Sequence, residues 1–249
     1  MTQLAQSVQP SVSIVISTFN RNPQLYQTLA SIRWQKYAGG LEIIVVDDGD
    51  LSHGYPSAKF VCGRFGAKWI RCCRPASTSF RNPSLPNNMG IRAAAGEVVI
   101  LQNAECRHDA PDNLARLTAL VTPTRAVFAR VLSQQEDGTV GMLYCGEENP
   151  RPYFFCGAIR REWLLRLRGF DEDFSGSGYD DDDLGDRLAG AGVEFVFSDV
   201  AVTHQWHPPA GTYSDVAEMR ALYQEKTSAM LRGELGLERN VGKTWGGQP

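Results

Sequence analysis

The chain has 249 residues, of which 43% are hydrophobic and 21% are charged, and its net charge is −3. This length is enough to bury the core of one large domain, and the slightly acidic balance argues against a broad basic surface for nucleic acid. Apolar runs stay below the roughly 18 residues of a membrane span, and MTQLAQSVQP has neither the basic nor the apolar part of a signal peptide, so we expect a cytoplasmic protein without a transmembrane anchor.

The first half of the chain alternates apolar runs with helical stretches. SVSIVIST, at 11–18, is apolar and β-branched, which is typical of a buried parallel strand. The next two signals predict a helix start, with Asn22 as the N-cap and Pro23 at the first helical position. Further strands are expected at 41–49, 67–73, 97–103 and 125–132, and further helices within 83–96 and 111–121.

After about residue 132 the alternation is less regular. Residues 133–142 predict a hairpin or an excursion, and residues 152–174 predict a strand, a helix and a turn. A helix is expected at 180–192, a short strand at 193–198 and a polar loop at 200–209. Residues 214–236 predict a C-terminal helix capped by Ser214, and NVGKTWGGQP, at 240–249, predicts a flexible tail.

Strands that alternate with helices indicate βαβ units, and hence an α/β fold with a mostly parallel sheet flanked by helices. Ligands bind such sheets outside the carboxyl ends of the strands. Polar residues stand at three of these predicted ends, which makes them candidate binding residues: Thr18, Asn20 and Arg21; Asp47 and Asp48; Asn103 and Glu105.

Each of these clusters has two interpretations. Asp47-Asp48-Gly49 is either an ordinary turn or a carboxylate pair that grips a ribose hydroxyl or a base edge. Residues 103 and 105 point to the same side of an extended chain, where an amide and a carboxylate oxygen can hold a hard divalent cation. Taken alone, this second pair is equally consistent with a loop.

Two histidines, His204 and His207, flank Gln205 and Trp206 near the end of the predicted domain. A spacing of three residues can bring two imidazoles to one cation on a turn, although one of them can equally be an ordinary surface histidine. We expect one metal ligand here, and the first candidate is His204. No cysteine stands near this pair to complete a zinc site.

The segment GSGYDDDDLGDRL places four aspartates, Asp180 to Asp183, at a predicted helix start. Acidic residues in a first turn are favoured by the helix dipole by roughly 0.3–1 kcal/mol each, which explains one or two of them. Mutual repulsion offsets this gain for four in a row, so a nearby cation or substrate hydroxyl is expected. A carboxylate at a helix start can accept the proton of an attacking alcohol.

Signatures of other nucleotide sites are absent from the sequence. There is no Gly-x-Gly-x-x-Gly, no Gly-x-x-x-x-Gly-Lys-Ser/Thr and no Gly-x-Ser-x-Gly. These absences disfavour Rossmann cofactor binding, P-loop chemistry and a serine-hydrolase elbow.

Together the motifs resemble those of a family 2 inverting glycosyltransferase with the GT-A fold, from about Ser11 to Pro208. VSIVISTFNRNPQLYQTLASI, EIIVVDDGD and NNMGIRAAAGEVVILQNAE resemble the opening strand and helix, the nucleotide-binding strand end and the approach to the Asp-x-Asp metal motif. GFDEDFSGSGYDDDDLGDRL is similar to the acceptor motif of galactosyltransferases, and THQWHPP to the late metal histidine. The resemblance implies one domain at 1–210, with a nucleotide-sugar half at 1–130 and an acceptor half at 131–210, followed by a C-terminal helix and tail at 211–249.

The resemblance also implies roles. Asp181 would be the general base, with Asp180 beside it, and a Mn²⁺ or Mg²⁺ ion would be held by Glu105 with His204 or His207. Arg92 would lie near the diphosphate or the donor sugar, and the residues lining the donor nucleotide would be Thr18, Asn20, Arg21, Asp47, Asp48, Asn88 and Asn103. Because Asn103 and Glu105 replace the usual two aspartates, one negative charge is lost and metal affinity should be weaker.

The expected reaction moves a sugar from a nucleotide-sugar, with UDP as the expected nucleotide, to a hydroxyl acceptor. The acceptor stays open between a glycan or polysaccharide, a protein side chain, and a hydroxylated DNA base such as 5-hydroxymethylcytosine, for which the basic segment at 151–168 would meet phosphates. The alternatives are a nucleotidyltransferase and an inactive sugar- or protein-binding module of the same fold. The sequence fixes neither the donor sugar nor the oligomeric state.

Overall fold

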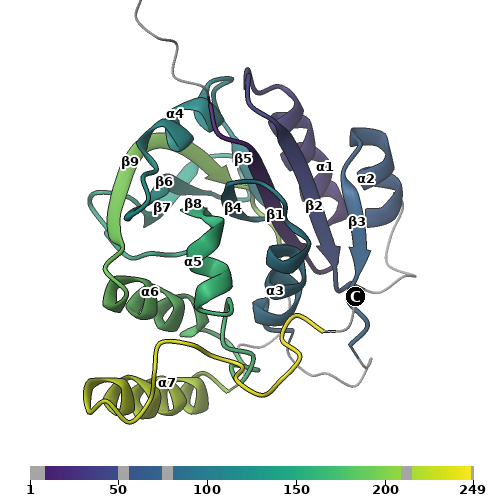
Figure 1. The fold of residues 1–249 in the computed structure, drawn as a ribbon. Coiled ribbons are helices and arrows are strands. Elements are labelled where there is room, and N and C mark those ends of the chain that lie inside the picture. Colours follow the sequence, from purple (N-terminus) through teal and green to yellow (C-terminus); the bar gives the residue numbers. More distant parts are fainter. Residues whose placement is uncertain (1–8, 50–55, 75–80, 209–214, 248–249) are drawn as a thin grey trace, which may run out of the picture.

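Figure 1 shows a computed structural model of the chain, which describes residues 9–49, 56–74, 81–208 and 215–247. A nine-stranded sheet runs in the order β3-β2-β1-β4-β8-β6-β9-β5, and β7 pairs with β6 outside this order. The strands are β1 (Val12–Thr18), β2 (Leu41–Asp47), β3 (Lys68–Arg71), β4 (Val98–Asn103), β5 (Cys106–His108), β6 (Arg125–Gln134), β7 (Val140–Cys145), β8 (Cys156–Arg160) and β9 (Glu194–His204).

Helices cover the sheet. In the described parts of the chain they are α1 (Asn22–Arg33), α2 (Ala58–Phe65), α3 (Ser84–Ala93), α4 (Asn113–Leu120), α5 (Arg161–Arg166), α6 (Asp180–Gly190) and α7 (Val216–Leu231). Helix α2 was not predicted; it begins after Ser57, whose hydroxyl accepts a hydrogen bond from the Phe60 N–H, as N-cap residues do.

The first half of the sheet is parallel and contains a switch in strand order. β1, β2 and β3 lie side by side, and the chain then crosses to place β4 on the other side of β1. Because such crossovers are right-handed, α1 and α2 cover one face and α3 covers the other. The carboxyl ends of β1 and β4 therefore flank the switch point, where ligands bind in sheets of this kind.

The second half of the sheet is mixed, which refines the expectation of a mostly parallel sheet. β8 runs antiparallel to β4 and β6, β5 runs antiparallel to β9, and β6 and β7 form a hairpin, whereas β6 and β9 are parallel. The predicted hairpin at 133–142 thus joins two antiparallel strands. The fold is an α/β domain with one hydrophobic core, to which both halves of the sheet contribute.

Close packing of α3 on the sheet explains one glycine. A Cβ added to Gly90 would lie 2.3 Å from Val15 Cγ1, so only a glycine lets α3 approach β1 this closely. Val15 is fully buried, in line with the apolar pattern of a central parallel strand.

Three local predictions are wrong. The N-cap of α1 is Arg21 and not Asn22, so Asn22 is the first helical residue and Pro23 is the second. The predicted loop at 200–209 is strand as far as His204, because β9 pairs with both β6 and β5. The tail is packed from Asn240 to Gly247, where it contacts α3 and the 168–172 turn.

The proposed cap Ser214 and the boundary between 210 and 211 lie outside the described residues. In the part of the chain that the structure describes, no helix combines the length and apolar character required to span a bilayer.

Candidate functional site

Strand register brings the first cluster together. Thr18 pairs with Asp47 across β1 and β2, and Ser17 pairs with Asn103 across β1 and β4. The parallel pairing of β1 with β2 and with β4 therefore places Thr18, Asp47 and Asn103 at one edge of the sheet, as predicted. Thr18 Oγ1 is buried there without a hydrogen-bond partner among the described residues, so the edge retains a free polar atom.

The two acidic residues after β2 have different partners. Asp47 Oδ1 accepts the Gly49 N–H at 2.9 Å, which is the turn interpretation, while Oδ2 accepts Trp69 Nε1–H at 3.2 Å. Asp48 is buried and forms ion pairs with Arg74 and with Arg81 Nη1, the latter at 2.9 Å. The two carboxylates thus hold three arginines beside the carboxyl end of β2.

We call Arg71, Arg74 and Arg81 the basic wall. The sequence did not predict that these three arginines form a cluster. Arg71 Nη1 lies 3.5 Å from Asp47 Oδ1, and the Arg81 guanidinium lies 5.3 Å from the centre of the Phe19 ring. Arginines scattered over a loop and a strand end carry no local signature, so only their common approach to Asp47 and Asp48 reveals the cluster.

Arg21 joins three segments at the switch point. Its Nε lies 3.2 Å from Glu105 Oε1, and its Nη2 donates to the Pro208 carbonyl at 3.2 Å. The preceding Asn20 has a left-handed backbone (φ 55°), and its side-chain oxygen would lie 2.7 Å from a Cβ on Gly49. The loops after β1 and β2 are therefore in contact, and Gly49 permits that contact.

Pairing of β5 with β9 brings Glu105 to the late histidines. Cys106 pairs with His204, and the Gln205 N–H donates to the Glu105 carbonyl at 2.9 Å. His207 Nε2 then lies 3.9 Å from Glu105 Oε1, and the His204 and His207 ring centres are 5.3 Å apart. The two predicted metal segments, which are far apart in sequence, meet at one point.

The donor atoms at this point suit a divalent cation. His207 Nδ1 lies 2.9 Å from the Pro208 carbonyl, which can only accept, so Nδ1 donates this hydrogen bond and Nε2 is the ring nitrogen directed toward the Glu105 carboxylate. A carboxylate oxygen and an imidazole nitrogen are both donor atoms that divalent cations accept, and the Glu105 oxygen that faces His207 is also paired with Arg21. Within the described residues, however, no group of three or more His, Cys, Asp or Glu side chains is arranged to hold a metal.

His204 has a different environment. Burial is the main reason that its pKa lies below the ordinary value, with Glu105 opposing and His207 adding to the shift. Its ring packs edge-on against Tyr144 and Phe155, with ring centres 5.3 Å and 5.5 Å away. His207 is therefore the imidazole that lies within 3.9 Å of Glu105 Oε1, whereas His204 was the first candidate from the sequence.

The four aspartates at the start of α6 are not equivalent. Burial raises the pKa of Asp180 to about 6, and Asp182 and Asp183 add to the shift. For Asp181, burial and then the charges of Asp180 and Asp182 raise the pKa well above its usual range. Asp182 instead pairs with Arg151 Nη2 at 2.7 Å.

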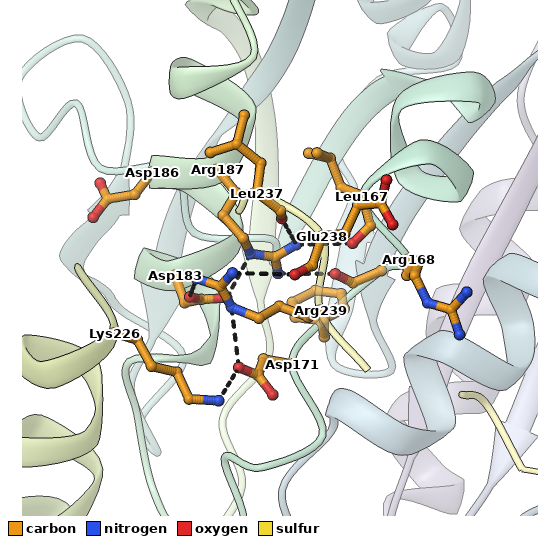
Figure 2. Close-up of polar contacts among 12 residues, drawn as sticks. Leu167, Arg168, Asp171, Asp183, Asp186, Arg187, Lys226, Leu237, Glu238 and Arg239 are labelled. Carbon is orange, nitrogen blue, oxygen red and sulfur yellow. Dashed lines mark hydrogen bonds and ion pairs between the residues drawn. The ribbon is translucent and has the colours of Figure 1, made fainter. Parts of the chain in front are cut away.

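Asp183 is an anchor for the helix. It is fully buried, and its Oδ2 accepts a hydrogen bond from Arg187 Nε at 2.7 Å, as Figure 2 shows. This role was not predicted from the sequence, although an Asp and an Arg four residues apart on a helix can signal such a pair. This assignment leaves Asp180 and Asp181 as the candidates for chemistry.

An aromatic cluster links the imidazoles to the aspartates. Tyr144 stacks on Phe155 with ring centres 5.0 Å apart, and Tyr153 meets Phe155 at 5.9 Å. Phe155 contacts His204, while the backbone of Phe154, the residue before it, hydrogen-bonds to Asp181. The metal candidates and Asp181 thus border the same cluster, which the sequence analysis read only as a strand.

Two predicted donor residues lie elsewhere. Asn88 is fully buried, and its amide bonds the Phe170 backbone and Glu172 Oε1, each at 2.8 Å. Arg92 Nη1 donates to the carbonyls of Trp245 and Gly247. Both side chains hold the 170–172 turn and the tail, and neither joins the cluster at the strand ends.

The predicted basic segment is largely engaged within the protein. Arg151 pairs with Asp182, Arg160 with Glu97, and Arg168 Nη2 donates to backbone carbonyls of the tail. These contacts engage three of the five arginines of the segment within the protein.

Two family models match the chain. Glycosyl transferase family 2 matches residues 13–168, and the model described as the N-terminal domain of galactosyltransferase matches residues 140–208, which include the aspartates of α6. Chondroitin synthase from Pasteurella multocida is 24% identical over 246 residues, which cover 80% of this chain and 25% of that protein. The chain spans about a quarter of the length of the curated relatives it matches.

Solved structures show the same fold. The mannosyltransferase PcManGT from Pyrobaculum calidifontis, in complex with GDP-Man and Mn²⁺, superposes with a TM-score of 0.63 at 22% identity, covering 90% of this chain and 65% of that one. TarS from S. aureus superposes with a TM-score of 0.64 at 16% identity, covering 91% of this chain and 41% of that one.

Proposed function

Because the chain belongs to glycosyl transferase family 2 and has the GT-A fold, we propose that it transfers a sugar from a nucleotide-sugar, a UDP-sugar, to a hydroxyl group of a glycan. The observation that carries this proposal is the meeting of Arg21, Glu105 and His207 at the switch point of the sheet. The similarity to a chondroitin synthase, which by its name makes a polysaccharide, supports a polysaccharide acceptor.

Donor binding is assigned to the strand ends. Asp47 is the residue that would contact the base or ribose, Asp48 acts through the arginines that it orients, and the free Thr18 Oγ1 would bond the nucleotide. Asn20 shapes the loop beside them, and Asn103 lines the edge. A guanidinium wall suits a nucleoside diphosphate because it pairs well with phosphate oxygens.

Metal binding is assigned to Glu105 and His207, with His204 behind them. A carboxylate oxygen and an imidazole nitrogen are suitable ligands for Mn²⁺, and the ligands not supplied by the protein would be donor phosphates and water. A bound Mn²⁺ or Mg²⁺ ion would supply positive charge against the charge that develops on the diphosphate. Support comes from the chemistry of the donor atoms, and the similar mannosyltransferase binds Mn²⁺.

Asp181 is assigned as the general base. The acceptor oxygen attacks the anomeric carbon from the face opposite the nucleotide, and its proton passes to the Asp181 carboxylate. The bond between the anomeric carbon and the diphosphate oxygen breaks, its electron pair stays on the diphosphate, and the configuration inverts. A base with a raised pKa accepts a proton near neutral pH more readily than an ordinary aspartate.

The decisive experiment is a panel of sugar nucleotides with Mn²⁺, scored for nucleoside diphosphate release with and without acceptors. The acceptors are glycan oligomers and, as a separate arm, hydroxymethylated duplex DNA. Release that depends on a glycan supports the proposal, and release that depends only on DNA overturns the glycan assignment. Release of pyrophosphate identifies a nucleotidyltransferase, and the absence of any release or donor hydrolysis overturns transfer in favour of a binding module.

A further inference from the structure

A buried network of charges includes Asp183, the last of the four aspartates at the start of α6 (Figure 2). The carboxylates of Asp171 and Asp183 are each 1% exposed, and the side chains of Arg187 and Arg239 are 0% and 3% exposed. Charges so far from water are tolerated only when they are paired and hydrogen-bonded. The position of each member therefore depends on its partners.

Arg239 connects the two carboxylates. Its Nη2 donates to Asp183 Oδ1 at 3.0 Å, and its Nε lies 3.2 Å from Asp171 Oδ2. Arg187 Nε donates to the other carboxylate oxygen of Asp183, Oδ2, and Arg187 Nη2 donates to the Gly169 carbonyl at 2.8 Å. Lys226 of α7 completes the pairing of Asp171.

Arg239 belongs to a segment that we call the C-terminal strap, residues 237–247, which Figure 1 shows passing from α7 toward α3. Asn240 Nδ2 donates to the carbonyls of Arg168 and Phe170, and the Gly246 N–H donates to Glu172 Oε1 at 2.6 Å. At its end, the strap accepts two hydrogen bonds from Arg92 of α3. It therefore ties the acceptor-side helix α6 to a helix of the donor half.

The first turn of α6 needs such support. It holds four adjacent carboxylates, and it follows Tyr179, whose backbone is left-handed (φ 67°) and whose side chain makes no capping hydrogen bond. A non-glycine residue in this conformation is held by its surroundings. Asp183 is two residues beyond Asp181, so its pairing with Arg239 fixes the turn that carries the proposed base.

We propose that Arg239 is a positioning residue, which holds the first turn of α6 through Asp183 so that Asp181 faces the acceptor, and that the strap is therefore part of the active unit. The expected effect on kcat rests on the proposed function. The expected effect on the structure of the first turn of α6 does not. A lysine at 239 keeps the charge but cannot reach both carboxylates with a fork of two nitrogens.

The test compares Arg239→Lys with the matched control Arg232→Lys. Arg232 lies in the same region and also pairs with a carboxylate, that of Glu234, but both side chains are more than half exposed. With an active donor and acceptor pair, Arg239→Lys is expected to lower kcat at least fivefold and to leave the KM for the donor within twofold. Arg232→Lys is expected to change neither.

The pH profile separates positioning from general loss of structure. Asp180 and Asp181 are faced by Asp182 and Asp183 on their own helix, by Asn82, by the Phe154 backbone and by Arg151. Asp183 raises the pKa of Asp180, and the charge of Asp180 in turn raises the pKa of Asp181. Weaker pairing of Asp183 is therefore expected to move the acid limb of kcat to higher pH in Arg239→Lys. An unmoved limb with an unchanged kcat overturns the proposal.

Hydrogen exchange provides a readout that needs no activity. The amides of residues 180–183 are expected to exchange faster in Arg239→Lys than in the wild type or Arg232→Lys. If the wild type transfers no sugar, the proposed function fails, but exchange still decides whether Arg239 holds α6. Equal exchange in all three proteins overturns the inference whatever the activity. Should Arg239→Lys fail to fold, the double variant Asp183→Asn/Arg239→Met removes both charges of the pair. Wild-type kcat and exchange in that double variant would overturn the inference. A lower kcat or faster exchange of residues 180–183 would support it.

Discussion

The guanidinium of Arg21 lies against the carboxylate of Glu105, with Nε 3.2 Å from Oε1, and the same oxygen is 3.9 Å from His207 Nε2. A cation of the chain itself therefore neutralises part of the charge that a metal ion would use. Because Asn103 stands where the resemblance would place a second acidic residue, the net negative charge at this point is small.

Arg21→Met should increase the affinity for Mn²⁺ measured without nucleotide. The substitution removes a positive charge that opposes the ion, and a gain of about tenfold corresponds to about 1.4 kcal/mol. Electron paramagnetic resonance of free Mn²⁺ measures the affinity directly. Arg107→Met is the control, because Arg107 pairs with Asp109 and not with Glu105. Equal affinity in Arg21→Met and wild type would show that Arg21 does not compete with the ion.

Asp181→Asn should lose most turnover and keep donor binding. The amide retains the size of the carboxylate but cannot accept the acceptor proton, and general base catalysis typically contributes about 10²–10⁴-fold. Nucleoside diphosphate release measures turnover, and calorimetry measures donor affinity. Asp182→Asn is the control, because Asp182 lies on the same turn as Asp181 but pairs with Arg151. Unchanged turnover in Asp181→Asn would remove it from the base role.

Turnover should fall on the acid side of the pH profile at a higher pH than an ordinary aspartate would give. The base must be ionised to work, and burial and neighbouring carboxylates raise the pKa of Asp181 well above its usual range. The acid limb of kcat is therefore expected at a clearly higher pH than the pKa of an ordinary aspartate. A limb near pH 4 would contradict a raised pKa of Asp181 in the working enzyme.

Asp180→Asn should make the protein more stable at neutral pH. Its pKa rises from 3.8 to about 6 on folding, so the folded state binds more protons between these values and loses stability as pH increases through them. Removing the charge should recover up to about 3 kcal/mol at pH 7 and very little at pH 3.5. Denaturant unfolding at both pH values measures this, and a gain that is equal at both would exclude the ionisation as its cause.

Gly90→Ala and Gly63→Ala should have opposite effects on stability, although both glycines lie inside helices. A Cβ at residue 90 would lie 2.3 Å from Val15 Cγ1, whereas none of the described atoms lies within 4 Å of a Cβ at residue 63. The first substitution should cost about 1–3 kcal/mol through overpacking, and the second should stabilise α2 by about 0.5–1 kcal/mol. Thermal unfolding compares them, and equal shifts would mean that α3 packs less tightly than described.

The sequence by itself determined the parallel half of the fold and the polar residues at its strand ends. These features are local: an apolar β-branched run reads as a buried strand, and the residue that follows it lies at the sheet edge wherever the strand goes. Thr18, Asp47 and Asn103 are therefore neighbours for a reason that the sequence already contains. The order of the motifs, read with the resemblance, also gave the family.

Tertiary structure decided which side chains meet. Only the pairing of β5 with β9 brings His207 to Glu105, and only the folded strap shows that Asp183 belongs to Arg239 and that Asn88 serves the 170–172 turn. Periodicity reports the face of an element that is buried, but it carries no information about the partner that buries it. Partners about a hundred residues apart in sequence, such as Glu105 and Gln205, are selected by register and packing in the whole domain.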